Sequence, residues 1–226
     1  MVVIEQLLSS AEVQQFTQAL EQAKWDEGTK TAMGMAASVK RNRQAAPDDP
    51  IVQQLANTLL GKIGASAGII SAALPNKIFP PCFNQYAESE EYGFHVDAAI
   101  MRMPNSQDVL RSDVSMTVFL SDPESYEGGE LIIATEFGEQ SVKLPAGHAV
   151  VYPSSSLHKV TAVTKGRRLA AITWMQSMIA DGHLRQNLYE LDRCIQSLIN
   201  KQTADREQLD QLHHVYHNLI RQNADV

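Results

Sequence analysis

Cysteine is scarce in this chain of 226 residues, which contains only Cys82 and Cys194. The two lie far apart and in no metal-binding spacing, so we expect free thiols in a reducing cytoplasm rather than a disulfide framework. Long apolar runs are also lacking, because the segments 67–74 and 169–175 are far shorter than the roughly 18 residues that cross a membrane. The sequence therefore predicts a cytoplasmic protein with no membrane partner.

Positive charge is not in excess, since 19 Lys and Arg residues stand against 26 Asp and Glu residues, for a net charge of −7. That balance gives no support to nucleic-acid binding, which favours a basic face. Hydrophobic residues make up 44% and charged residues 20% of the chain, as in an ordinary globular protein. A chain of this length buries roughly 70 to 75% of its unfolded surface, which is enough to enclose a water-poor active site.

Two helices are predicted in the N-terminal part of the chain. Ser9 and Glu12 have capping-box spacing and precede apolar residues at helical intervals, which predicts an amphipathic helix over 10–24. Pro50 follows two aspartates and opens a second helical stripe. Between the two helices, a short strand is expected at 36–40.

From about residue 78 the sequence changes to short β-type runs separated by turn residues. The expected strands are 78–87, 93–100, 114–121, 129–135, 140–144, 148–153, 157–163 and 167–177. No long helix interrupts this series, which argues against a parallel βαβ sheet. The pattern favours a mainly β fold with flanking helices, whose core is a jelly roll, the double-stranded β-helix.

Leucine-rich stripes at helical spacing return after the last expected strand and predict a helical hairpin over 178–226. Such a hairpin either caps the β domain or forms the seam of a homodimer. We therefore expect a domain over 1–177, with N-terminal helices in 1–77 and the jelly-roll core in 78–177, followed by the C-terminal hairpin.

His95 and Asp97 are two metal-ligand side chains placed two residues apart. In a β-strand they face the same side, while Phe94 and Val96 face the other. Downstream, His158 offers a third ligand. Two imidazoles and one carboxylate leave positions open on a metal, as in non-haem Fe(II) oxygenases, and zinc hydrolases also use three ligands with an open site. The ligand set alone therefore does not name the metal.

Arg168 favours the oxygenase over the hydrolase. With 157–163 and 167–177 taken as a hairpin, Arg168 pairs near Ala162, roughly 13 Å along the strand from His158. A guanidinium binds a carboxylate through two parallel N–H bonds, so an arginine beside an open metal site suggests a co-substrate that chelates the metal and presents a carboxylate at its other end. 2-Oxoglutarate has that shape.

Several short motifs occur in a consistent order. They are YGFHVD at 92–97, TVFLSD at 117–122, EGGEL at 127–131, LPAG at 144–147 and LH at 157–158, with Arg168 ten residues further on. Over about residues 78–177 this order resembles the prolyl-4-hydroxylase-like Fe(II)/2-oxoglutarate dioxygenases. With FNQY at 83–86, SDP at 121–123, YPSSSLH at 152–158 and the helical tail, nearly the whole chain resembles the bacterial PKHD-type hydroxylases.

This resemblance implies a set of roles for individual residues. It implies that His95, Asp97 and His158 are the ligands of Fe(II). It implies that Arg168 anchors the distal carboxylate of 2-oxoglutarate and that Tyr86 lies near this co-substrate. It further implies hydroxylation of a substrate by O2 with release of succinate and CO2, and a requirement for L-ascorbate, which rescues iron oxidised off-cycle.

Some features stay open under this resemblance. Some animal prolyl hydroxylases place a tyrosine where this chain has Val118, so the group that assists Arg168 is open, with Ser115 and Thr117 as candidate donors. The substrate is open between a peptide, a protein residue and a small molecule such as a siderophore. The segment 101–111 follows the iron motif, has loop composition and is a candidate substrate lid. The alternative function is a non-catalytic jelly-roll sensor that binds iron and 2-oxoglutarate.

Overall fold

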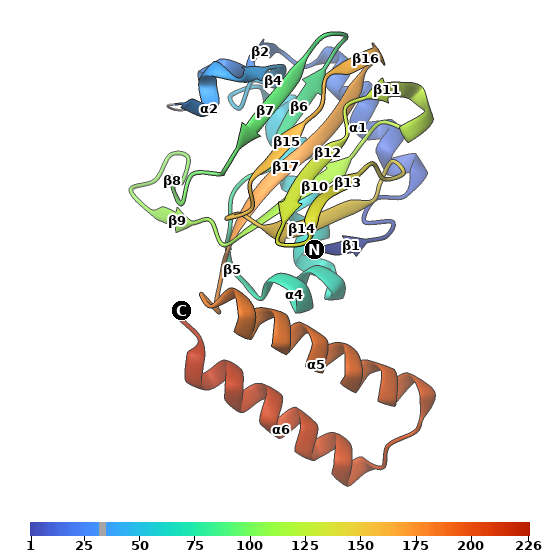
Figure 1. Cartoon of the computed structure of the whole chain (residues 1–226), viewed down its shortest axis with the longest axis vertical. Coiled ribbons are helices and arrows are strands. Elements are labelled where there is room, and N and C mark those ends of the chain that lie inside the picture. The colour runs from blue at the N-terminus through green and yellow to red at the C-terminus, as the bar shows by residue number, and fades with distance from the viewer. Residues whose placement is uncertain (32–34) are drawn as a thin grey trace.

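The computed structural model describes residues 1–31 and 35–226 and contains two antiparallel β-sheets, with helices and short ribbons around them (Figure 1). The strands of the larger sheet are β1 Val2–Ile4, β2 Trp25–Glu27, β4 Arg43–Ala45, β5 Pro75–Ile78, β6 Cys82–Tyr86, β10 Val114–Phe119, β14 Ala149–Pro153 and β17 Arg168–Ser177. Their order is β1-β14-β10-β17-β6-β4-β2, with β5 also paired to β17. This sheet carries the N-terminal strands that the sequence did not predict.

The smaller sheet faces the larger one across the interior. Its strands are β3 Lys40–Arg41, β7 Glu91–His95, β12 Leu131–Thr135, β13 Gly138–Val142 and β15 His158–Val160, in the order β13-β12-β15-β7-β3. Two further ribbons lie outside both sheets, and they pair β8 Ile100–Arg102 with β9 Val109–Arg111 and β11 Tyr126–Gly128 with β16 Val163–Gly166. The predicted mainly β jelly-roll core is confirmed, whereas the segment 101–111, predicted as a loop, forms most of the β8–β9 hairpin.

The expected hairpin between 157–163 and 167–177 is wrong. β15 pairs with β12 and β7 in the smaller sheet, whereas β17 pairs with β10, β6 and β5 in the larger sheet. Arg168 therefore lies opposite Tyr86 rather than near Ala162. The reason is that the chain changes sheets between these two strands, as it does repeatedly in a jelly roll, so β15 and β17 are not partners in a ladder.

The N-terminal helices are α1 Ser10–Gln22, α2 Met35–Ser38, α3 Pro50–Ala65 and α4 Ala67–Ala73, with a short 3-10 turn at η1 Gly28–Thr31. A second 3-10 turn, η2 Pro123–Ser125, lies between β10 and β11. Ser9 and Glu12 form the predicted capping box, and Asp49 caps α3 with Pro50 at its start. The helix α4 was not predicted. The strand expected at 36–40 is also wrong, because α2 extends to Ser38 and β3 begins only at Lys40.

Alternation along β10 separates the apolar core from the interior of the jelly roll. Val114, Met116 and Val118 pack in one buried cluster with residues of α1, α3 and α4. Ser115 and Thr117 are also buried, each at 2% exposure, and point to the opposite face. Because helices cover one face and the smaller sheet lies over the other, polar side chains on the inner face are held away from solvent.

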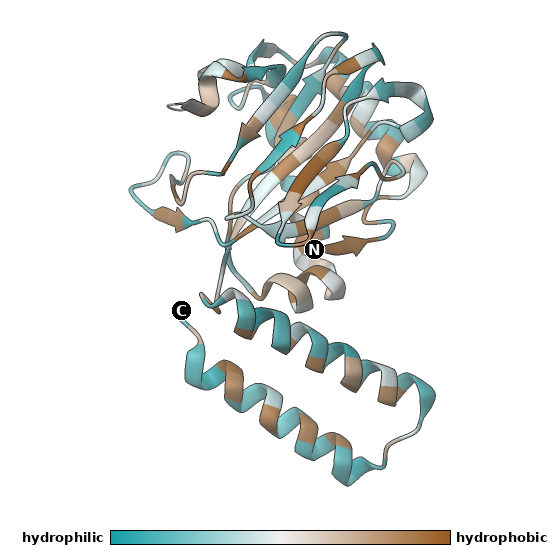
Figure 2. Cartoon of the chain, in the orientation of Figure 1, coloured by the Kyte–Doolittle hydropathy of each residue, from teal (hydrophilic) through white to brown (hydrophobic). Residues whose placement is uncertain are grey.

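The predicted C-terminal hairpin consists of α5 Gly182–Lys201 and α6 Arg206–Asn223, which project together from one end of the molecule (Figure 1). Apolar bands recur along both helices (Figure 2). The hairpin joins the rest of the chain where Leu188 packs with Leu74 and Ile179, and where Ser71 on α4 donates a hydrogen bond to Asp192 on α5. No helix in the described part of the chain has the length and apolarity needed to cross a bilayer.

Candidate metal centre and co-substrate pocket

The two histidines of the expected ligand set are placed by the pairing of β7 with β15. His95 and His158 are direct cross-strand partners, and their ring centroids lie 4.2 Å apart. Each Nδ1 lies 2.9 Å from a backbone carbonyl oxygen two residues upstream, that of Gly93 for His95 and that of Ser156 for His158. A carbonyl only accepts, so each Nδ1 carries the proton and each Nε2 has a free lone pair. Both imidazoles are therefore in the tautomer that binds a metal through Nε2.

Asp97 completes the group. Its Oδ2 lies 3.9 Å from Nε2 of His158, and the side chain is 10% exposed. One ligand atom from each of His95, Asp97 and His158 can be chosen so that all lie within 4.8 Å of one another, the only such group among the described residues. A cluster of two imidazoles and one carboxylate suits a divalent metal with open positions for further ligands. The sequence-predicted trio is thus brought together in one place.

Aromatic rings and a buried amine surround the two imidazoles. Tyr92 stacks on His95 with centroids 3.5 Å apart, and Tyr152 packs edge-on against His158 at 5.3 Å. The ammonium of Lys40 lies 5.3 Å from the centroid of the Tyr92 ring, and burial lowers the pKa of Lys40 to about 8. Burial, followed by the nearby His158, lowers the pKa of His95 to about 4. His95 is therefore neutral at physiological pH, as a metal ligand must be.

The metal-free protein is expected to lose stability as the pH falls from about 6.5 towards 4. In the unfolded chain His95 has an ordinary pKa near 6.5, whereas in the folded protein its pKa is about 4. Between these values the unfolded chain binds the extra proton, so acid favours unfolding. Urea denaturation at a series of pH values measures the effect. The free energy of unfolding of a His95→Gln variant should depend less steeply on pH in this window. An equal slope in both proteins would show that His95 is not the group responsible.

Arg168 is a buried cation on the inner face of the larger sheet. It is 2% exposed and lies opposite Tyr86 in the register of β17 and β6. The guanidinium carbon lies 5.3 Å from the centroid of the Tyr86 ring and 5.4 Å from that of Phe119. Its Nε has no hydrogen-bond partner within the described residues. A buried guanidinium with an unused N–H is suited to receive an anion, and burial raises the pKa of Tyr86 to about 12, which keeps that phenol neutral.

Gly129 allows the chain to pass close to Arg168. Its φ is +65°, and an added Cβ would lie 3.0 Å from atoms of Tyr126 and Val163 and 3.1 Å from Cδ of Arg168. Only glycine adopts this backbone conformation at little cost. The loop before β12 therefore packs directly against the side chain of Arg168.

Replacing Gly129 by alanine is expected to destabilise the fold by about 1–3 kcal/mol and to weaken 2-oxoglutarate binding by displacing Arg168. Gly138→Ala is the matched control, because Gly138 also has a positive φ of +110° but no described atom lies within 4 Å of its added Cβ. Calorimetric titration with 2-oxoglutarate should then show weaker binding for Gly129→Ala alone. Equal losses of 2-oxoglutarate affinity in the two variants would show that crowding at Arg168 does not affect this binding.

Tyr152 is a buried phenol beside the three expected ligands, with its ring against His158. It is 5% exposed, and burial, with a further contribution from Asp97, raises its pKa, while Arg168 acts in the opposite direction. Ser115, a candidate partner of Arg168, instead donates its hydroxyl to Asp97 over 2.6 Å. The contacts of Tyr92 and Tyr152 with the imidazoles were not predicted from the sequence. The only signal for them was their presence in the same short motifs as His95 and His158.

Comparison with known proteins identifies the family. The sequence model described as "2OG-Fe(II) oxygenase superfamily" matches residues 81–176, and that described as "PKHD-type hydroxylase C-terminal domain" matches residues 182–225. A PKHD-type hydroxylase of Shewanella frigidimarina is 68% identical over 98% of both chains, and one of Alteromonas mediterranea is 62% identical over 100% of both.

A solved structure supports the fold. A Pseudomonas putida prolyl-4-hydroxylase aligns with a TM-score of 0.53 and 18% identity over 78% of this chain and 91% of its own. At that identity the likeness concerns the fold alone. The high-identity relatives carry the family assignment: the chain belongs to the PKHD-type hydroxylases, which are Fe(II)- and 2-oxoglutarate-dependent oxygenases.

Proposed function

We propose that His95, Asp97 and His158 hold Fe(II) and that Arg168 binds the distal carboxylate of 2-oxoglutarate. The observation that carries this proposal is that a possible metal site and a buried arginine occur together in the interior of the jelly roll. Three ligand atoms lie within 4.8 Å of one another, and a buried guanidinium has an N–H with no described partner. The donor set suits Fe(II), and the arginine offers the paired N–H groups that a carboxylate accepts. Tyr86 is proposed to contact the same co-substrate.

The reaction proposed is hydroxylation of an unidentified substrate. When bound, iron and 2-oxoglutarate supply the oxidation: O2 provides one oxygen atom to the hydroxyl group of the product and one to succinate, and CO2 is released. The chain orients and shields these reactants. Arg168 fixes one end of the co-substrate, while Phe119 and Tyr152, which are 1% and 5% exposed, keep water out of the space between the sheets.

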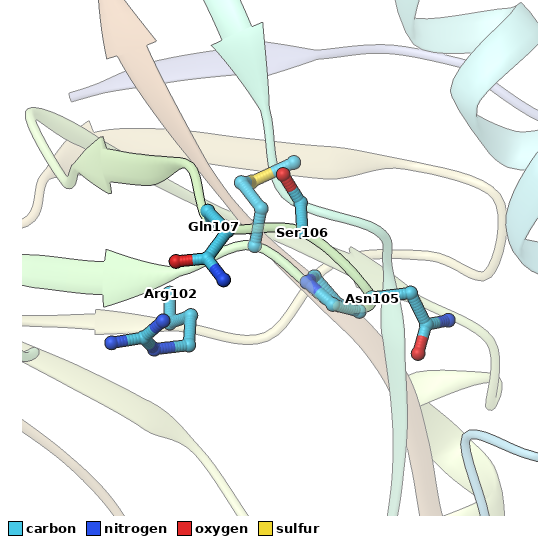
Figure 3. Close-up of a pocket in the computed structure, with 6 residues that line it drawn as sticks. Arg102, Asn105, Ser106 and Gln107 are labelled. Atoms are coloured by element: carbon cyan, nitrogen blue, oxygen red, sulfur yellow. The ribbon is translucent and has the colours of Figure 1, made fainter.

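The β8–β9 hairpin is the proposed substrate lid. It extends from the body of the protein directly after the segment that carries Asp97 (Figure 1). A hollow at its tip is lined by Arg102, Met103, Pro104, Asn105, Ser106 and Gln107. The polar ends of Arg102 and Gln107 lie on the same side, whereas the amide of Asn105 points away from them (Figure 3). A cation with neutral hydrogen-bonding groups suits a polar small molecule or a peptide with an acidic group.

An Arg102→Ala variant is expected to respond less to substrate while keeping its basal, substrate-free succinate formation. The reason is that Arg102 lies in the lid and not among the residues proposed to hold iron or 2-oxoglutarate. Peptides and small molecules are screened for stimulation of succinate formation by the unaltered protein, and the stimulating compound is then titrated against the variant. Arg206→Ala, on α6, is the control. If the half-saturating concentration of the stimulating compound is the same for Arg102→Ala and the unaltered protein, Arg102 does not take part in substrate binding by the lid.

Further properties are proposed from the same family membership. L-Ascorbate is proposed to sustain turnover by returning oxidised iron to Fe(II). The free thiols of Cys82 and Cys194 support a cytoplasmic location. The division into a catalytic domain over 1–177 and a helical unit over 178–226 is supported by the projecting hairpin, whose apolar bands make a homodimer seam reasonable.

The proposed reaction is tested with protein prepared without oxygen. Fe(II), ascorbate and 2-oxoglutarate are added, O2 is admitted, and succinate and remaining 2-oxoglutarate are measured. We expect slow succinate formation, in a 1:1 ratio with the 2-oxoglutarate consumed. Binding of 2-oxoglutarate without succinate under all screened substrates would favour the sensor function instead. Absence of both binding and turnover would overturn the co-substrate assignment.

A further inference from the structure

Asp97 is held differently from the two histidines. His95 and His158 lie within paired strands, whereas Asp97 lies two residues beyond the end of β7. Its carboxylate is nevertheless fixed, because Ser115 on β10 donates from Oγ to Oδ2 over 2.6 Å. β10 belongs to the larger sheet and β7 to the smaller. The third candidate ligand is thus oriented by a side chain from the opposite sheet.

The Ser115 hydroxyl makes a second hydrogen bond whose direction follows from its single proton. Its Oγ lies 2.7 Å from Oγ of Ser154. A hydroxyl has one proton, and that of Ser115 is donated to Asp97, so Ser115 accepts from Ser154. The hydrogen bonds therefore run from Ser154 to Ser115 to Asp97. In such a chain each bond polarises and strengthens the next.

Both serines are built into the protein interior. Ser115 and Ser154 are each 2% exposed, so bulk water does not compete for their hydroxyls. The segment after Asp97 is held to the same region, because Ser112 donates from Oγ to the carbonyl oxygen of Ala98 and from its backbone N–H to that of Ala99. The position of the carboxylate is therefore set both by its own chain segment and by the hydrogen bonds from Ser154 to Ser115 to Asp97, here called the two-serine relay.

We propose that Ser115 and Ser154 are positioning residues of the metal centre, which hold the Asp97 carboxylate in the orientation that coordinates the metal. This inference rests on the proposed role of Asp97 as a ligand. Partners that orient metal ligands are worth about 10- to 100-fold in metal affinity. Ser115 acts on Asp97 directly, and Ser154 acts only through Ser115. Removing Ser154 should therefore not lower metal affinity any further once Ser115 is gone, which a merely structural role of the two serines would not predict.

The test uses Mn2+ as an oxygen-stable metal probe, titrated by calorimetry into the full-length metal-free protein. Ser115→Ala is expected to weaken Mn2+ binding about 10- to 100-fold, and Ser154→Ala to weaken it less. The double variant should bind no more weakly than Ser115→Ala, because Ser154 has no effect once Ser115 is gone. Ser115→Thr keeps a hydroxyl and should retain affinity within a few-fold of the unaltered protein.

Ser177→Ala is the matched control. Ser177 is a fully buried serine on β17 whose hydroxyl bonds to the carbonyl of Leu74, away from the trio, so Mn2+ binding should be unchanged. The metal-free melting temperature of each variant separates loss of fold from loss of affinity. If Ser115→Ala does not fold, Ser154→Ala and Ser115→Thr carry the test.

Two outcomes separate this inference from the proposed function. Unchanged Mn2+ affinity in folded Ser115→Ala, or multiplied losses in the double variant, would overturn the relay alone. Unchanged Mn2+ affinity in Asp97→Ala would instead overturn the ligand assignment on which the relay depends. Weak binding in Asp97→Ala and Ser115→Ala, with rescue by Ser115→Thr, supports both.

Discussion

Replacing Asp97 by alanine is expected to lower iron-dependent succinate formation by more than about 100-fold, beyond the 10- to 100-fold that changes to outer-shell partners bring. The variant keeps the two imidazoles but loses the only carboxylate of the trio, so the proposed metal site would lose both a ligand and a negative charge. Fe(II) affinity should fall in parallel. Succinate is measured under saturating Fe(II), 2-oxoglutarate and ascorbate, so that a weakened metal site is not mistaken for a slow reaction.

Two companion variants sharpen this result. Asp97→Glu keeps the charge but moves it by one methylene, away from the hydroxyl of Ser115, and should recover little activity. Asp122→Ala changes an exposed aspartate on the loop before η2 and should leave turnover intact. Substantial succinate formation by Asp97→Ala at saturating Fe(II) would show that the carboxylate is not a required ligand.

Replacing Arg168 by methionine is expected to weaken 2-oxoglutarate binding by at least about 100-fold. The expectation follows from two charge-assisted hydrogen bonds at about 1.5–3 kcal/mol each, with 1.4 kcal/mol for each factor of ten. Methionine has a similar length and fills much of the same space without charge. The measurement is anaerobic calorimetric titration of the Fe(II)-loaded protein with 2-oxoglutarate.

The same variant should not lower the melting temperature of the ligand-free protein. Arg168 is 2% exposed, and its Nε has no described partner, so the empty protein already bears the desolvation cost of a buried cation. Apolar residues of similar volume often replace such charges without loss of stability. The cation–π contacts with Tyr86 and Phe119 offset part of that cost, and for this reason we expect no large gain either.

Arg167→Met is the control for this substitution. Arg167 is the preceding residue and is exposed, so the same change there should leave 2-oxoglutarate affinity unaltered. Arg168→Lys keeps a positive charge but not the two-pronged geometry, and its affinity should lie between those of the methionine variant and the unaltered protein. Unaltered 2-oxoglutarate binding by Arg168→Met would place the distal carboxylate elsewhere in the protein.

Local sequence patterns predicted those parts of the fold that depend on neighbouring residues. The capping box at Ser9 and the proline at Pro50 locate the starts of α1 and α3, because a helix start is determined by nearby donors and acceptors. Alternation around His95 also holds, since Phe94 and Val96 are 39% and 53% exposed while His95 is 9% exposed. The helix α4 was not predicted, because its signals are weak. Ser66 is a possible helix cap, but the seven residues that follow it are too few to show a clear helical period.

Features that depend on distant residues could not be predicted in this way. The pairing of Arg168 with Tyr86 arises because β17 crosses to the larger sheet, and no local pattern specifies which sheet a short strand joins. Ser115 is a similar case. The family resemblance made it a candidate donor to Arg168, whereas its bond to Asp97 depends on how the two sheets face each other. The candidate ligands were predictable from spacing and family resemblance, whereas the groups that orient them required the fold.

The division of the site between two sheets affects how the protein is held together. His95 and His158 project from the smaller sheet and Arg168 from the larger, beside a buried cluster in which apolar and aromatic side chains of both sheets pack together, as in other sandwiches. In the proposed enzyme, a metal held by side chains of the smaller sheet and a dicarboxylate held by Arg168 on the larger sheet would add to this packed interior. Because 2-oxoglutarate is consumed in each cycle, the proposed enzyme would lose and regain part of the packing between its two sheets with every turnover.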